Sequence, residues 1–451
     1  MSSKVKVALV GIAGYGDAYL TALLNAHQSQ QAADFDLVGV VDPMPSRCRH
    51  LDELASRSVK IHSDLEALYA QVTPDLVMMA TPIHLHAPHT CFALERGSNV
   101  LCEKPLAATV RDARKMVATE QLAHRFVAIG YQWSFSKAVQ NLKRDIMAGH
   151  FGAPKLLKSL VFFPRGLDYF TRNDWVGRIK TDGGQAVFDS PANNAAAHYL
   201  HNMLYLLGPT RETSAMPVTV QAELYRANQI ENYDTAAIRC KVDCGAELMF
   251  YTSHTVPPRL GPIARYEFED AVISYEAESG AGFTARFKSG KARRYGEPNL
   301  ERNQKMWQSI EAARSHEQNG NGNGVAHQPI ACGTRAAIPH TLCIAAAQAS
   351  MPQILTFPSA MLVNERIGEG MTMVCVTGLH AALVQCYDQA ILPSEHGGLD
   401  WAKAGQVIPV KENIAGAGDP DGSPHPAELT RESIGATTNP AQADRAGRLP
   451  V

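Results

Sequence analysis

The sequence predicts an α/β fold that begins with a parallel sheet and continues into a second region rich in strands. Two observations predict it. In the first 130 residues, short apolar runs alternate with helical patterns, whereas beyond residue 150 β-rich runs follow one another closely. The chain of 451 residues is also long enough for two or three domains with sizeable cores.

Five short apolar runs in the first region have the length of buried strands. They span residues 5–11, 35–42, 75–81, 98–104 and 125–131. Helical patterns lie between several of them, at 17–28, 86–97 and 109–123. This alternation favours right-handed βαβ units and a parallel sheet. A ligand of such a sheet lies beyond the carboxyl ends of its strands.

The end of the first strand carries a glycine-rich turn typical of dinucleotide binding. Its residues are Gly11, Ile12, Ala13, Gly14, Tyr15 and Gly16. Gly11 suits a tight turn and Gly16 suits close helix packing, although Ala13 stands where the fingerprint has its second glycine. Asp42, at the end of the second strand, can accept hydrogen bonds from ribose hydroxyls and would repel a 2′-phosphate. We therefore expect NAD rather than NADP, with nearby Arg47 as the argument for NADP and a nucleotide-free scaffold as the alternative.

The bulk composition excludes several classes of partner. The formal net charge of −2 predicts neither a nucleic-acid nor a membrane partner, and no apolar run approaches a membrane span. Nine scattered cysteines are typical of reduced thiols, which predicts a cytoplasmic protein. The nearest pair, Cys240 and Cys244, lacks a second pair to complete a zinc site, so we expect no metal.

Two further strand ends resemble the Gfo/Idh/MocA family, the glucose–fructose oxidoreductase and inositol dehydrogenase group. Thr81, Pro82 and His86 match its Thr-Pro turn with a following histidine, and Glu103, Lys104 and Pro105 match its Glu-Lys-Pro motif. The resemblance covers roughly residues 5 to 390, strongly in the first 130. It implies a Rossmann doubly wound parallel sheet followed by an α+β domain with an open, largely antiparallel sheet. It further implies cofactor contacts from these residues and Gln132, and a substrate between the domains.

These features divide the chain into an NAD-binding domain (1–130), a substrate and oligomerisation domain (131–410) and a C-terminal arm (411–451). The β-rich runs span 155–165, 219–227, 235–242, 246–256, 264–277 and 283–295, and helical patterns precede and follow them at 130–154 and 334–354. We expect helices on one face of this sheet and a partner copy on the other, in a homodimer or homotetramer. A helix end and a loop fill 309–328, and the Gly- and Pro-rich arm is expected to lack fixed structure.

A long segment without a clear pattern, 164–184, carries the residues that suit a sugar-like ligand. Tyr169 and Trp175 offer flat apolar faces, while Arg165 and Arg172 can hold a carboxylate, sulfonate or phosphate. The alternative is a solvated surface loop or an interface.

The stretch "DSPANNAAAHYLHNMLYLLG" (189–208) supplies the second set of candidates. The family carries Asp, His and Asp at positions that correspond to Asn194, His198 and His201, so both acids are replaced here. His198 matches the family's catalytic histidine, and the helical spacing puts the three side chains on one face. Asn194 and Asn193 are expected to orient substrate, Asp189 to supply the lost charge, and Ser190 and Pro191 to start the helix. A metal on the histidines, or a purely structural cluster, is the alternative.

Together these residues predict an NAD-dependent oxidoreductase that acts on a hydroxyl of a sugar, glycoside or cyclitol. Lys104 and His198 are the expected proton acceptors, because a lysine at a buried strand end is poised for proton transfer. One alternative is a glycosidase that oxidises its substrate transiently, eliminates the aglycone, adds water and reduces the ring again. The other is a non-catalytic NAD-binding sensor.

Overall fold

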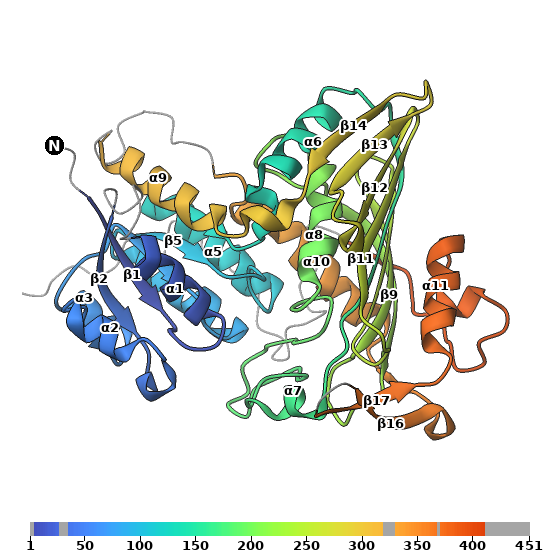
Figure 1. The fold of residues 1–451 in the computed structure, drawn as a ribbon, viewed down its shortest axis with the longest axis horizontal. Helices are drawn as coiled ribbons and strands as arrows, with labels where there is room; N and C mark the ends of the chain where they lie inside the picture. Colours follow the sequence, from blue (N-terminus) through green and yellow to red (C-terminus); the bar gives the residue numbers. More distant parts are fainter. Residues whose placement is uncertain (1–3, 27–34, 319–329, 368–369, 411–451) are drawn as a thin grey trace, which may run out of the picture.

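A computed structural model describes residues 4–26, 35–318, 330–367 and 370–410 (Figure 1). The predicted arm from residue 411 lies outside these residues. Two sheets organise the chain, one in each half, and helices lie between them. No helix among the described residues has the length and apolar character that crossing a bilayer requires.

The first sheet is parallel, with the strand order β3-β2-β1-β4-β5-β6. Its strands are β1 (Val5–Val10), β2 (Phe35–Val41), β3 (Ile61–His62), β4 (Leu76–Met79), β5 (Asn99–Cys102) and β6 (Val127–Ile129). The helices of this half are α1 (Gly16–Ala26), α2 (Leu51–Ser56), α3 (Leu65–Tyr69), α4 (His86–Glu95) and α5 (Val110–Ala123). The order reverses between β1 and β4, which is the position where doubly wound sheets bind their ligand. The predicted parallel sheet is therefore confirmed.

A helix from the second half of the chain returns to this sheet. Helix α9 (Gln304–Gln318) packs against β1, β4 and β5 and buries Met306, Ile310 and Ala313 in the same core. Figure 1 shows α9 above the first sheet, far from its neighbours in sequence. The two halves are thus joined by more than the chain crossing at residue 130.

The second sheet is ten-stranded in the described residues and largely antiparallel, with the order β14-β13-β12-β11-β7-β10-β9-β8-β15 and β18 paired to β8. Its strands are β7 (Pro154–Phe162), β8 (Pro217–Arg226), β9 (Thr235–Val242), β10 (Glu247–Ser253), β11 (Leu260–Phe268), β12 (Ala271–Glu276), β13 (Phe283–Phe287), β14 (Ala292–Gly296), β15 (Leu355–Thr356) and β18 (Ile408–Pro409). The predicted runs 264–277 and 283–295 each divide into two strands joined by a turn. The open, largely antiparallel sheet is confirmed.

Helices cover both faces of this second sheet. Besides α9, the α-helices described in the second half are α6 (Lys137–Met147), α7 (Leu167–Thr171), α8 (Ala197–Leu206), α10 (Thr334–Ser350) and α11 (Leu379–Gln389). Helices α8 and α10 lie on the side of the first sheet, and α11 lies on the outer side (Figure 1). Leu160 and Met249 of the sheet pack there against Leu383 of α11. Part of the face that we expected a partner copy to cover is therefore covered by this chain.

Candidate functional site

The glycine-rich turn after β1 has the geometry that a dinucleotide needs. Gly11 has a φ of +81°, and a Cβ there would lie 2.7 Å from Ala80 O. A Cβ on Gly16 would lie 1.9 Å from Gly11 O, so α1 can begin this close to the turn only with glycine. A Cβ on Gly14 would meet nothing within 4 Å, which leaves open space over the turn. Backbone N–H groups at the start of α1 can hold a pyrophosphate in that space, so the residues present fit the cofactor.

Asp42 lies beside this turn and is almost fully buried. Its carboxylate accepts hydrogen bonds from the backbone N–H groups of Ile12 at 3.0 Å and Met44 at 2.8 Å. These bonds fix the carboxylate at the end of β2 and leave it able to accept further bonds, as a ribose requires.

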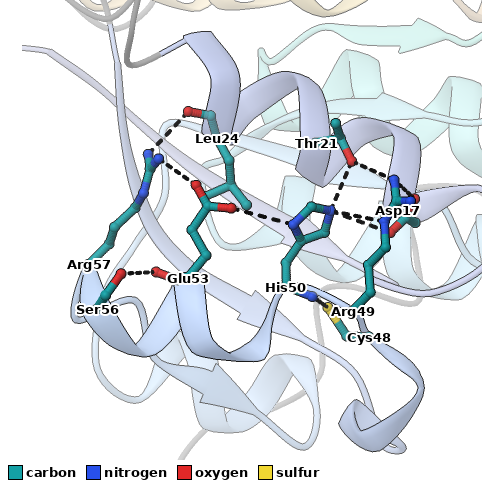
Figure 2. Close-up of polar contacts among 9 residues, drawn as sticks. All are labelled: Asp17, Thr21, Leu24, Cys48, Arg49, His50, Glu53, Ser56 and Arg57. Atoms are coloured by element: carbon teal, nitrogen blue, oxygen red, sulfur yellow. Dashed lines mark hydrogen bonds and ion pairs between the residues drawn. The ribbon is translucent and has the colours of Figure 1, made fainter.

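The cations that follow Asp42 differ in their surroundings. Figure 2 shows that Arg49 points back to α1, where it bonds Asp17 at 2.8 Å and Thr21 at 3.2 Å. His50 lies between Asp17 and Glu53, at 3.5 and 3.4 Å. Both Arg47 and Arg49 are exposed, and Arg49 differs in its surface ion pair with Asp17.

The Thr-Pro turn after β4 and the Glu-Lys-Pro segment after β5 are joined through His86. This side chain is buried, with Nδ1 at 2.7 Å from Pro105 O and Nε2 at 3.0 Å from Thr81 O. Burial lowers the pKa of His86 to about 4, so the ring is neutral and donates from one nitrogen at a time. His86 therefore holds the two loops together beneath the site rather than facing the space over the glycine turn. Pro82 lies in the same turn and is partly exposed.

Glu103 binds a lysine that the sequence analysis missed. Lys305, the second residue of α9, forms a buried ion pair with Glu103. The Tyr19 hydroxyl donates to the same carboxylate at 2.7 Å. Burial acts to raise the pKa of Glu103, but Lys305 and Lys104 outweigh it, so the pKa lies below its ordinary value. The Glu103 carboxylate thus holds the start of α9 through its ion pair with Lys305. We had expected Glu103 to contact the cofactor.

Tyr15 and Gln132 lie at the edge of this anchor. The Tyr15 hydroxyl is 3.4 Å from Gln132 Oε1 and 3.4 Å from Lys305 Nζ, and the Tyr15 ring is about half exposed. Both side chains are therefore placed between the glycine turn and α9, where they can contact a ligand of that turn.

Lys104 lies at the centre of the site and is held by Asn194. Its Nζ donates to Asn194 Oδ1 at 2.9 Å and to Asn194 O at 3.0 Å. Burial lowers the pKa of Lys104; Glu103 opposes this shift, and the charge of Lys305 adds to it. A neutral amine has two N–H donors and one lone pair, so two bonds to Asn194 leave the lone pair free to accept a proton.

Asp189 completes this chain of hydrogen bonds. Its Oδ1 accepts from Asn194 Nδ2 at 2.7 Å, and its Oδ2 accepts from the Gly177 N–H at 2.7 Å. Burial raises the pKa of Asp189, although both hydrogen bonds and the charges of Arg172 and Lys104 act in the opposite direction. Asp189 is thus connected to Lys104 by two hydrogen bonds through the side chain of Asn194.

His198 lies on the same wall as Lys104. Its Nδ1 is buried and has no hydrogen-bond partner among the described residues. Burial and, next, the charge of Lys104 hold the pKa of His198 well below its ordinary value, so the ring is neutral. The side chain meets Tyr131 edge-on at 6.0 Å between ring centroids. Tyr131 in turn bonds His340 of α10 at 2.9 Å, a histidine without any sequence signal.

Three expectations for the stretch 189–208 differ from the structure. Helix α8 begins at Ala197, because residues 191–196 form turns, although the Ser190 hydroxyl does accept the Asn193 N–H at 3.3 Å. Asn194 therefore does not share a helix face with the histidines. His201 is buried, stacks on Tyr131 at 3.7 Å and bonds Ser134 at 3.1 Å, so its position is that of a core histidine and not of a substrate ligand. Asn193 is also buried and donates to Phe188 O at 3.1 Å, which holds the turn.

The segment 164–184 closes one side of the site. Trp175 packs with Val187 against Ile83 and Ala108 of the first half, so the segment touches both domains. The guanidinium groups of two arginines lie close to the ring of Tyr169, with Arg165 Cζ at 4.8 Å and Arg172 Cζ at 4.1 Å from the ring centroid. The structure therefore brings all four predicted residues of this segment to one region, beside Asp189.

No group of three or more His, Cys, Asp or Glu side chains that could hold a metal ion occurs among the described residues. The nine cysteines are all free thiols, and eight of them are buried.

Comparison with known proteins agrees with this geometry. Among curated proteins, the chain is 30% identical to 1-carboxy-3-chloro-3,4-dihydroxycyclohexa-1,5-diene dehydrogenase of Comamonas testosteroni, over 42% of this chain and 45% of that protein. It is 33% identical to inositol 2-dehydrogenase 1 of Saccharopolyspora erythraea, over 37% and 48%. The chain thus spans about half the length of the curated relatives it matches.

Solved structures extend the likeness in fold to the second half. The WlbA dehydrogenase from Chromobacterium violaceum, solved with NADH and UDP-GlcNAcA, superposes with a TM-score of 0.61 at 21% identity, covering 76% of this chain and 94% of that one. Residues 5–131 match the model of the oxidoreductase family with an NAD-binding Rossmann fold. The likeness to the Gfo/Idh/MocA oxidoreductases is thus one of sequence over residues 5–131 and one of fold over the second half.

Proposed function

We propose that the protein is an NAD-dependent oxidoreductase that acts on a CH–OH group of a sugar, glycoside or cyclitol. The observation that carries the proposal is the position of the buried Lys104 amine and its hydrogen bonds to Asn194. Its amine is held by two acceptors of Asn194 and lies at the strand ends, beside the dinucleotide turn. Its pKa is lowered by burial, so a proton acceptor is in place where a substrate hydroxyl would lie.

The cofactor proposal rests on the turn and on Asp42. The backbone of residues 11–16 would hold the pyrophosphate, and the Asp42 carboxylate would hold a ribose and disfavour a 2′-phosphate. Arg49 pairs with Asp17 in this arrangement, and a 2′-phosphate would compete with that carboxylate for it. When bound, NAD supplies the acceptor for the hydride that leaves the substrate carbon.

The protein's own residues orient the substrate and move the proton. Lys104 accepts the proton of the substrate hydroxyl. Its two N–H groups donate to Asn194, which leaves the nitrogen lone pair for the substrate, and Asp189 fixes Asn194 by accepting its amide N–H. His198, neutral through burial, can hydrogen-bond the same hydroxyl. The Glu103 carboxylate is paired with Lys305, and although its charge acts to raise the pKa of Lys104, burial outweighs it. This balance favours the neutral lysine that proton transfer requires.

A cofactor assay on a broad panel of sugars, glycosides and cyclitols tests the proposal. Growth of the absorbance of reduced nicotinamide with at least one compound is the expected result. Release of an aglycone without net cofactor reduction would instead identify the redox-neutral glycosidase. NAD binding with no turnover of any compound, and no effect of Lys104→Ala, would identify a sensor.

A further inference from the structure

Three arginines gather on two aromatic rings at the mouth of the site. Arg165 and Arg172 both lie close to the ring of Tyr169. Arg259, which directly precedes β11, lies over Phe163 with its Cζ at 4.2 Å from the centroid, and Arg165 approaches the same ring at 5.9 Å. Arg259 carried no sequence signal, because it lies 94 residues beyond Arg165 and 87 beyond Arg172 in the chain. We call these three residues the arginine cluster.

The arginine cluster lacks acidic partners. None of its members forms an ion pair within the part of the chain that the structure describes, whereas Arg178 in the same segment pairs with Asp182 at 2.5 Å. The Arg165 Nε is buried and has no hydrogen-bond partner among the described residues. Asp189 feels the charge of Arg172, but both of its oxygens already accept bonds from Gly177 and Asn194. Several like charges held this close repel one another unless an anion joins them.

The arginine cluster lies next to Lys104 and His198, the two residues proposed to contact the reacting hydroxyl. Lys104 donates to Asn194, and Asn194 donates to Asp189. Asp189 also accepts the N–H of Gly177, which lies in the same segment as Arg165 and Arg172, so this segment borders the reacting groups. On the other side, Phe163 meets the ring of Tyr199 at 6.0 Å, and Tyr199 directly follows His198. A ligand with one hydroxyl at Lys104 and His198 therefore has the arginine cluster beside it.

The segment that carries Arg165 and Arg172 packs against a two-stranded sheet of the second domain. Helix α7 packs on β17 (Met371–Val376), which pairs with β16 (Leu362–Ile367). The contact is close, since a Cβ on Gly166 would lie 2.8 Å from Met371 Cγ. The aromatic rings and this support hold the guanidinium groups in place before a ligand binds, which favours affinity.

We infer that the substrate carries an oxoanion, a carboxylate or a phosphate, and that the arginine cluster binds it. The inference rests on the proposed function and narrows its substrate to an acidic or phosphorylated sugar or cyclitol. Guanidinium groups suit this task, because their planar N–H forks match the oxygens of both anions in a bidentate manner. The oxoanion also supplies the negative charge that the cluster lacks.

Calorimetric titration of the full chain saturated with NADH tests the inference with sugars matched in stereochemistry. Glucose, galactose and mannose are compared with their uronates and with their 6-phosphates. We expect a charged member of at least one set to bind roughly 10–100-fold more tightly than its neutral parent, as charged hydrogen bonds imply. Preference for the uronate identifies a carboxylate, and preference for the 6-phosphate identifies a phosphate.

Variants assign the effect to the arginine cluster. Arg172→Met and, separately, the exposed Arg259→Met should each reduce the preference for the charged sugar, while Arg178→Met in the same segment should keep it. Equal or tighter binding of neutral sugars, no binding of any charged sugar, or equal losses in all three variants would overturn the inference. Failure of NADH itself to bind in the first titration would instead refute the proposed function.

Discussion

Replacing Lys305 with methionine should leave the Glu103 carboxylate buried without its cation. In the wild type, the side chains of Lys305 and Glu103 are only 2% and 7% exposed, and they pair with each other. The Tyr19 hydroxyl at 2.7 Å and the Lys104 backbone N–H at 3.1 Å would remain, but neither carries a charge. Methionine keeps an unbranched apolar stem, so the substitution mainly removes the positive charge.

The size of the effect follows from the burial. Breaking a buried ion pair by removing one partner costs about 3–5 kcal/mol, because an uncompensated charge remains. At ~2–4 °C per kcal/mol, the midpoint of thermal unfolding should fall by an amount on the order of 10 °C. The double variant Glu103→Gln/Lys305→Met removes both charges and should recover most of this loss.

The same substitution should alter the pH dependence of turnover. The charge of Lys305 helps to lower the pKa of Lys104, so its loss raises that pKa. Because the neutral amine is the proton acceptor, the rise of kcat/KM with pH should move to higher pH in Lys305→Met. A purely structural role for Lys305 would destabilise the protein without this displacement.

Thermal melts and pH profiles of the purified chain provide both readouts. Lys4→Met is the matched control, since Lys4 pairs with Asp36 on the surface with 44% and 55% of the side chains exposed. Exposed pairs contribute ~0–1 kcal/mol, so its melt should stay close to wild type. A melt of Lys305→Met as high as that of Lys4→Met would refute the role assigned to the buried pair.

Two further substitutions probe the other parts of the site. Asp189→Asn weakens the charged hydrogen bond that orients Asn194 toward Lys104, so steady-state kinetics should show kcat lowered by roughly 10–100-fold at unchanged NAD affinity. Because the Asp189 charge acts to raise the pKa of Lys104, the rise of the rate with pH should also move to lower pH in this variant. An unchanged kcat would contradict the role given to Asp189. Asp42→Ala removes the expected ribose acceptor, so fluorescence titration should show NAD bound roughly 10–100-fold more weakly and the preference over NADP reduced; equal NAD affinity in the two proteins would contradict the place given to Asp42.

The sequence predicts the first domain well because its signals are local. Five of the six strands are short apolar runs, whereas the two-residue strand β3 has no such run, and the spacing of Gly11 and Gly16 reflects a steric demand within one turn. The same locality explains the errors around residue 200. Helical spacing indicates which side chains share a face, but it does not indicate whether that face meets a ligand or the core, and His201 meets the core.

The residues that the sequence analysis missed act across long separations. Lys305 reaches Glu103 from 202 positions away, and His340 reaches Tyr131 from 209. Neither lies in a recognisable motif, since a single lysine or histidine in a helix has no spacing to reveal its partner. Asn194 was found only because the resemblance to the family placed a polar residue at that position.

The central claim is that the Lys104 amine takes the proton during hydride transfer, and single-turnover kinetics test it most directly. Wild type, Lys104→Met and the exposed control Lys60→Met are each loaded with NAD and mixed with a substrate found by the panel, and reduced nicotinamide is followed in time. The account predicts that Lys104→Met binds NAD as wild type does but forms reduced nicotinamide about 10²–10⁴-fold more slowly, while Lys60→Met behaves as wild type. Equal rates in Lys104→Met and wild type would contradict it.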